Sequence, residues 1–315
     1  MKILIAHDGS ACAEAALDDL TRAGLPDKAE ALVLAVTEIW LPAQPHSSYE
    51  IVEEARSARD PADLQRIHVR HSPAVEEALG LAQVAQARLR TSFPHWVVEA
   101  EGTFGSPASE VLRLADEWAP DLIVAGSHGR TALGRFVLGS VSQKILTEAT
   151  CSVRIARGRV EVEGSAPRLV IGLDGSDAAD AAVAEVAARH WPAGTEVRVV
   201  VADEPLTPTV VGGLIAPVRH WVEEVNHEGQ GLVQAIVHRA AVMLRAAGLT
   251  VSERVLEGDP KRVLVAEAEE FRADTIFLGS TGSGTRLERF LLGSVSSAIA
   301  ARAHCSVEVV RRGSR

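Results

Sequence analysis

Two segments of the chain repeat each other, and this repeat constrains the fold more than any other feature of the sequence. The first runs from Asp121 to Ala149 (DLIVAGSHGRTALGRFVLGSVSQKILTEA) and the second from Asp274 to Ala303 (DTIFLGSTGSGTRLERFLLGSVSSAIAARA). Each begins with a short apolar run of the length of a buried strand, continues through glycines and ends in a helix-like segment. Because the parts recur in the same order, we expect the chain to fold as two similar halves.

The glycines of the first segment follow the spacing G-x2-G-x9-G-S, at Gly126, Gly129, Gly139 and Ser140. The first two are predicted to let the backbone approach a ligand and to adopt positive φ. The Gly-Ser pair would open the next helix, whose free N–H groups and positive dipole end suit a phosphate. The second segment has the same order at Gly279, Gly282, Gly293 and Ser294, with ten residues instead of nine before the Gly-Ser pair.

Strand-like and helix-like segments alternate along both halves. Strands are expected at residues 2–7, 30–39, 96–100, 122–125 and 151–156, and again at 168–173, 196–202, 251–257, 275–278 and 306–310. Alternation at this spacing predicts an α/β fold of two tandem Rossmann-like domains, each a five-stranded parallel sheet with helices on both faces. The expected domains are residues 1–157 and 168–315, joined by a linker at 158–167. A helix at 218–247 is expected to be interrupted near Gly229, and residues 41–71 are expected to form a long loop with some helix.

An aspartate follows the first expected strand of each half, in Asp8-Gly9-Ser10 and in Asp174-Gly175-Ser176. Ligands of parallel sheets bind at the carboxyl ends of the strands. If the first and fourth strands of a half are neighbours, Asp8 and the glycine segment meet at one crevice.

The net charge and the lengths of the apolar runs limit the kinds of partner that we expect. The net charge is −10 and no long run of Lys or Arg occurs, which argues against nucleic acid. No stretch reaches the 18 apolar residues of a membrane span, and the N-terminus does not have the pattern of a signal peptide, so the cytoplasm is the expected location.

These motifs resemble the universal stress protein family in its tandem two-domain form, and the resemblance covers nearly the whole chain twice. It implies binding of ATP, with Mg²⁺ as a further option, or of a related adenine nucleotide. The residues that it carries over are Asp8, Val36, Gly126, Gly129, Gly139, Ser140, Val141 and Ser142, and in the second half Asp174, Gly279, Gly282, Gly293 and Ser294. It also implies dimer-like packing of two such domains, either within the chain or in a homodimer.

Each of these residues also has a plainer interpretation. Asp8 and Ser140 could simply cap helices, and Gly126 and Gly129 could be turn glycines. Arg130, Arg135, Arg286 and Arg289 could reach phosphates or lie in solvent. His7 is expected to pack, and His128 has no partner motif that indicates catalysis. Mg²⁺ binding by Glu38, Asp203 and Glu204 is the weaker interpretation of three charged residues at strand ends.

Two nucleotide motifs are missing, namely the G-x4-G-K-[ST] loop and a G-x-G-x-x-G after the first strand. Fast hydrolysis is therefore not predicted, and a slow ATPase is the most that we expect. The resemblance implies a stress-response module that responds to a bound adenine nucleotide. A scaffold that uses residues 41–71 as a partner surface is the alternative from a different class.

Overall fold

The computed structural model describes residues 1–38, 72–128, 138–157, 165–203, 216–280 and 292–311, and within α8 it describes side chains from residue 231 onward. The chain divides into two compact units, Met1–Thr21 with Pro26–Gly158 and Arg22–Leu25 with Arg159–Arg315. The boundaries at 157 and 168 remain predictions, and most of the expected linker and the expected loop at 41–71 lie outside the described residues.

The first unit contains a parallel sheet with the strand order β3-β2-β1-β4-β5. Its elements are β1 (Lys2–Ala6), α1 (Ala11–Asp19), a 3-10 turn (Leu20–Arg22), β2 (Glu30–Thr37), α4 (Pro73–Ser92), β3 (Val97–Phe104), α5 (Pro107–Trp118), β4 (Leu122–Gly126), α6 (Ser140–Glu148) and β5 (Ser152–Ala156). The middle strand, β1, is buried along its centre at Ile3, Leu4 and Ile5, as its apolar sequence predicts for a strand covered on both faces.

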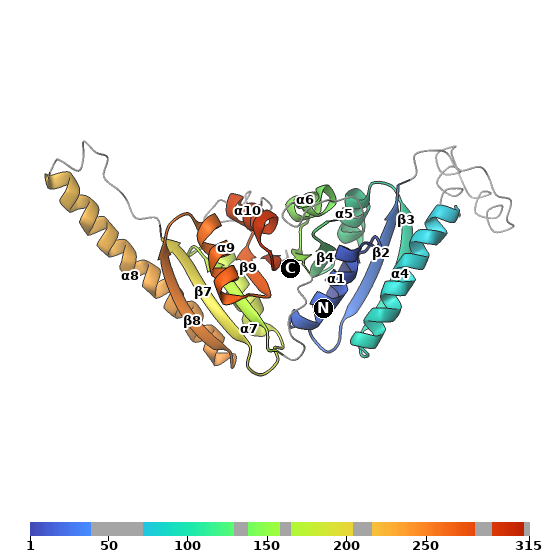
Figure 1. Ribbon diagram of the computed structural model, residues 1–315, viewed down its shortest axis with the longest axis horizontal. Helices are drawn as coiled ribbons and strands as arrows, with labels where there is room; N and C mark the ends of the chain where they lie inside the picture. The colour runs from blue at the N-terminus through green and yellow to red at the C-terminus, as the bar shows by residue number, and fades with distance from the viewer. Residues whose placement is uncertain (39–71, 129–137, 158–164, 204–215, 281–291, 312–315) are drawn as a thin grey trace. The chain divides into compact units, whose positions relative to one another are not determined.

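The order of the strands explains which helices lie together. The chain moves outward from β1 to β2 and β3, then returns to the other side of β1 for β4 and β5. Right-handed crossovers place the helices of the outward path on one face and those of the return path on the other. Accordingly α1 contacts α4, and α5 contacts α6 (Figure 1).

The second unit repeats this topology with the strand order β10-β9-β6-β7-β8. Its elements are β6 (Arg168–Leu173), α7 (Asp177–Ala188), β7 (Glu196–Asp203), α8 (Ala216–Ala246), β8 (Thr250–Glu257), α9 (Pro260–Phe271), β9 (Thr275–Gly279), α10 (Ser294–Arg302) and β10 (Ser306–Val310). The predicted fold class is therefore confirmed. The expected interruption of α8 near Gly229 is wrong, because the helix is continuous from Ala216 to Ala246.

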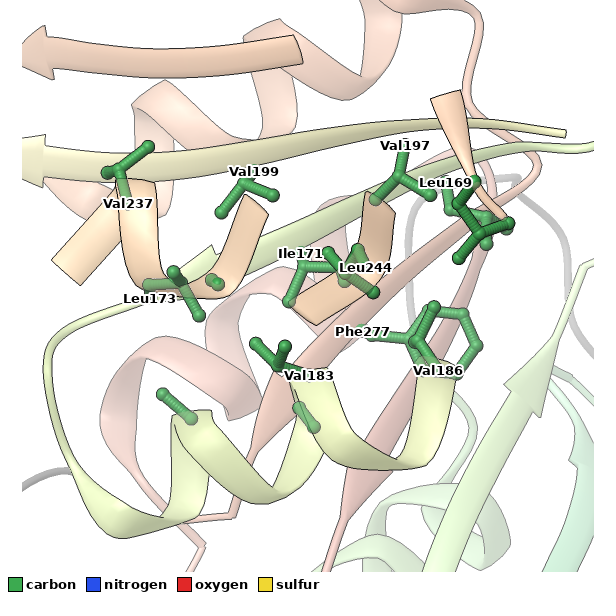
Figure 2. Packing of buried hydrophobic residues seen from close by; sticks show 14 of the residues in the cluster. Leu169, Ile171, Leu173, Val183, Val186, Val197, Val199, Val237, Leu244 and Phe277 are labelled. Carbon is green, nitrogen blue, oxygen red and sulfur yellow. The ribbon is translucent and has the colours of Figure 1, made fainter. Parts of the chain in front are cut away.

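Apolar side chains of α7 and α8 fill one side of the second sheet. Val183 and Val186 from α7 meet strand residues such as Ile171 and Phe277, while Val237 of α8 packs in the same cluster (Figure 2). All of these side chains are 2% exposed or less. Burial of each such side chain stabilises the fold by about 1.5–3 kcal/mol relative to exposure.

Candidate nucleotide-binding site

A cleft of about 220 Å³ opens at the carboxyl ends of β1 and β4, which are neighbours in the first sheet. The predicted site residues that line it are Asp8, Val36, Gly126, Gly139, Ser140, Val141 and Ser142. They come from three separate parts of the sequence. The sequence predicts that Asp8 and the glycine segment meet if β1 and β4 are neighbours, which they are. Val36, Val141 and Ser142 are residues that the family resemblance implies. Gly129, Arg130 and Arg135 lie outside the described residues.

The start of α6 supplies the donors at one end of this cleft. Gly139 is the N-cap, with φ −64°, and its own N–H donates to the carbonyl of Ser127 at 2.8 Å. The first helical bond runs from the N–H of Gln143 to the carbonyl of Gly139 at 2.8 Å. The N–H groups of Ser140, Val141 and Ser142 precede that bond and have no acceptor inside the helix. Three donors and the positive end of the helix dipole therefore lie together at the start of α6, an arrangement that suits an anion.

This geometry corrects two predictions about individual residues. Ser140 is the first residue of the helix and not its N-cap, so its hydroxyl does not accept a capping hydrogen bond. Gly126 is the last residue of β4 and is not among the glycines with positive φ. A Cβ atom there would lie 3.0 Å from the carbonyl carbon and oxygen of Cys12. Gly126 therefore allows β4 to approach α1, which is a packing requirement of the fold.

Ser142 holds the same strand end from the other side. Its hydroxyl donates to the carbonyl of Gly126 at 2.6 Å, and Ser296 repeats this contact on Gly279 at 2.8 Å. The hydroxyl proton of Ser142 is therefore already engaged in a hydrogen bond within the protein. The backbone N–H of Ser142 is the group that remains for a ligand.

Asp8 shapes the turn between β1 and α1. Its Oδ1 accepts from the N–H of Ser10 at 3.0 Å, while Ser10 Oγ accepts from the N–H of Ala13 at 3.2 Å. Gly9 between them has φ +72°, a conformation that favours glycine. Ser10 is thus the N-cap of α1, and the interpretation of Asp8 as the cap is wrong. The turn places Asp8 at the cleft.

Val36 presents backbone groups to the cleft. The N–H of His7 donates to the carbonyl of Leu34 at 2.9 Å, and Ala6 is the last residue of β1 in the ladder with β2. Alternate residues of a strand direct their N–H and C=O groups to the same side, so Val36 points its groups toward β1, as Leu34 does. Because Val36 lies beyond the end of that pairing, one donor and one acceptor extend toward the cleft.

Apolar side chains form part of the cleft wall. Leu34 and Val36 of β2 face it together with Val111 of α5, Ala6 of β1 and Ala125 of β4. Small-molecule sites are usually lined by apolar side chains with a few polar groups at defined positions.

Two histidines also line the cleft, although the sequence reasoning assigned neither of them to it. His7 is 4% exposed, and its Nε2 lies 3.2 Å from Oε1 of Glu14. His128 is 8% exposed, and its Nδ1 lies 3.0 Å from Oγ of Ser127. Within the described ranges, the remaining ring nitrogens, Nδ1 of His7 and Nε2 of His128, have no hydrogen-bond partner. The only sequence signal for this placement was their position near strand ends, since His7 directly follows β1 and His128 is the second residue after β4.

Burial changes the proton affinity of both rings. It lowers the pKa of His7 below the ordinary value, while the carboxylates of Glu14 and Asp8 act in the opposite direction. Burial and then the positive charge of Arg157 lower the pKa of His128. Both imidazoles are therefore predominantly neutral at pH 7.

A second cleft, of about 290 Å³, lies at the equivalent place in the second unit and is lined by Asp174, Gly279, Gly293 and Ser294 among others. Gly293 is the N-cap of α10, and its N–H donates to the carbonyl of Ser280 at 2.6 Å. The predicted residues are thus brought together here as well, except that Gly282, Arg286 and Arg289 lie outside the described residues.

The inner walls of the two clefts differ. Leu264 and Leu278 stand where the first unit has Val111 and Ala125, and Gly172 stands where it has Ala6. A Cβ atom on Gly172 would lie 2.7 Å from Cδ2 of Leu278, so the glycine compensates for the larger leucines. The pairing of β6 with β7 also extends one residue further than that of β1 with β2.

Among the residues that the structure describes, no three His, Cys, Asp or Glu side chains are grouped to hold a metal ion. Of the acidic residues considered for Mg²⁺, Glu204 lies outside this set.

The universal stress protein family model matches residues 1–157 and again residues 166–311. The chain belongs to the universal stress protein family. Because the model matches both halves, this is the tandem form of the family.

Known universal stress proteins agree with this assignment. One from Mycobacterium tuberculosis is 29% identical over 217 residues, which are 68% of this chain and 69% of that protein. One from Methanocaldococcus jannaschii is 38% identical over 90 residues, 29% of this chain and 50% of that protein. The crystal structure of one from Archaeoglobus fulgidus superposes with a TM-score of 0.59 at 20% identity and covers 99% of this chain and 97% of that chain. This last likeness supports the fold alone.

No helix in the described ranges is both long and apolar enough to cross a membrane.

Proposed function

We propose that this tandem universal stress protein binds ATP or a related adenine nucleotide in the first cleft. It would act as a ligand-responsive module in a stress response, with little or no hydrolysis. Homodimer formation and a cytoplasmic location remain predictions from the sequence. The second cleft is an additional candidate for the same ligand.

The observation that carries this proposal is the set of three backbone N–H groups at the start of α6, from Ser140 to Ser142. They lie at a cleft whose lining also includes apolar side chains. A nucleotide has the matching polarity, because its phosphates are anionic and its base is flat and largely apolar. Binding of the phosphates would satisfy donors that the helix leaves without partners.

The backbone groups of Val36 support adenine in particular. Val36 offers one N–H donor and one C=O acceptor beyond the end of the β1 pairing. The edge of adenine carries an amine donor next to a ring-nitrogen acceptor, which complements such a pair. Asp8, which lines the same cleft, would accept from ribose hydroxyl groups. Mg²⁺ enters this proposal only as the companion of a bound triphosphate.

A charge placed at the phosphate end tests the proposal. Ser140→Asp is compatible with α6, because a carboxylate in the first turn favours the helix dipole. The same carboxylate would repel phosphates, since like charges in contact cost several kcal/mol. We expect the affinity for ATP, measured by equilibrium dialysis with labelled nucleotide, to fall about a hundredfold.

Two matched variants make the result specific. Ser140→Asn has nearly the same size as Ser140→Asp without the charge, and we expect a loss of affinity that is about tenfold smaller. Ser294→Asp places the charge in the second cleft and reports whether that cleft contributes a binding event. Equal affinities of the parent, Ser140→Asn and Ser140→Asp would reject the first cleft as the site.

A further inference from the structure

His128 combines three properties that point to a ligand contact. Its side chain is more than nine-tenths buried, it lines the first cleft, and its Nε2 has no hydrogen-bond partner among the residues that the structure describes. A buried polar atom without a partner is unfavourable by about 1–3 kcal/mol, and a fold normally avoids this cost. A bound molecule in the cleft would remove it.

The surroundings of His128 indicate which part of a ligand it meets. The carbonyl oxygen of the preceding residue, Ser127, accepts a hydrogen bond from the N–H of Gly139 at 2.8 Å. Because Gly139 is the N-cap of α6, this bond places the segment after β4, which contains His128, beside the start of α6. Its Nδ1 lies 3.0 Å from Oγ of Ser127. When that hydroxyl donates to Nδ1, the ring proton of neutral His128 is on Nε2, and Nε2–H is a donor. His128 lines the same cleft as Ser140 to Ser142, and the bond between Ser127 and Gly139 ties the two segments together.

We propose that Nε2 of His128 donates to a phosphate of the bound nucleotide and that the ring takes up a proton when the nucleotide binds. The proposal rests on the proposed function and adds a regulation of that site. A phosphate group next to the imidazole favours its charged form and so raises its pKa in the complex. Binding of the nucleotide and of the proton are therefore linked, and each strengthens the other.

The direction of the pH dependence follows from the charges near the two rings. In the free protein, burial and Arg157 lower the pKa of His128, and bound phosphate would raise it. His128 then contributes most to affinity below its free pKa, and this contribution is lost as the pH rises through the pKa of the complex. His7 faces a different set of charges, namely Glu14, Asp8 and Arg88, and its Nε2 is already paired with Glu14.

The second half lacks both imidazoles. Leu173 occupies the position of His7, and Thr281, which lies outside the described residues, follows Ser280 in the sequence as His128 follows Ser127. Proton-linked binding is therefore a property that we assign to the first cleft alone.

The test is the ratio of ATP affinities at pH 5.5 and pH 8.5, for the parent chain and for His128→Gln. Glutamine keeps an N–H donor but does not titrate, and the titration of ATP itself is common to both proteins. We expect the ratio to be about tenfold larger for the parent, which corresponds to a rise of about one pKa unit. His95→Gln, the same substitution at an exposed histidine outside the cleft, is expected to keep the parent's ratio.

NMR on the parent chain tests the same proposal and does not depend on whether a substituted protein folds. The ring of His128 is followed by NMR across the same pH range with and without ATP, and we expect its pKa to rise when ATP is present. Equal ratios for parent and His128→Gln, or loss of the pH dependence in His7→Leu instead, would overturn the assignment to His128. Absence of ATP binding at every pH would instead reject the proposed function, and this inference with it.

Discussion

Replacing Gly279 by alanine is expected to lower the free energy of unfolding by about 3 kcal/mol. A Cβ atom there would lie 2.5 Å from the carbonyl carbon and 2.7 Å from the carbonyl oxygen of Ala178. Both are backbone atoms at the start of α7, so the strand and the helix would have to separate. The loss is measured by urea unfolding followed by circular dichroism.

Two other glycines serve as controls for this prediction. Gly126→Ala is the same change in the first unit, where the nearest atoms, those of Cys12, lie at 3.0 Å. The expected loss there is smaller, about 1 kcal/mol. Gly80 lies inside α4, and no atom of the described residues comes within 4 Å of the position that its Cβ would take, so Gly80→Ala should stabilise by about 0.5–1 kcal/mol. A Gly279→Ala protein as stable as the parent would show that the first glycine of the motif is not required for packing.

Replacing Glu267 by alanine is expected to cost about 3 kcal/mol of stability in the second unit. Arg198 and Glu267 are only 9% and 7% exposed, and Nη1 of Arg198 lies 2.9 Å from Oε2 of Glu267. The guanidinium carbon also lies 4.3 Å from the ring centre of Phe271. Removal of the carboxylate would leave a buried positive charge beside Glu270, whose side chain is 64% exposed and therefore compensates for it only weakly.

Glu270 provides the matched control for this ion pair. Its contact with Arg198 is 3.3 Å long and largely solvated, so Glu270→Ala should change the free energy of unfolding by less than about 1 kcal/mol. The double change Arg198→Met with Glu267→Leu removes both charges and should recover most of the loss. Equal effects of Glu267→Ala and Glu270→Ala would contradict the assignment of the buried pair.

The repeat in the sequence was sufficient to predict the fold class. Strand-length apolar runs that alternate with helical segments leave few arrangements, and right-handed crossovers select among them. The meeting of Asp8 with the Gly139-Ser140 pair could be predicted only on the condition that the first and fourth strands are neighbours, and the pairing of β1 with β4 meets that condition.

The roles of single residues were harder to predict, because they depend on contacts that the sequence does not encode locally. Gly126 has a neighbour in α1 that is remote in the chain, so its packing role was not visible from the motif. The capping role went to Ser10 and to Gly139 rather than to Asp8 and Ser140. Histidine is common in cores and at sites alike, and only the cleft geometry distinguishes the two for His128.

The most direct test of the central claim is the response of the backbone amides at the start of α6 to ATP. We predict that the ¹H resonances of the N–H groups of Ser140, Val141 and Ser142 move downfield and saturate together at the affinity found by dialysis. Such shifts report new hydrogen bonds from these donors to phosphate oxygens. Binding of ATP with these three resonances unmoved, or no binding of ATP at all, would contradict the account.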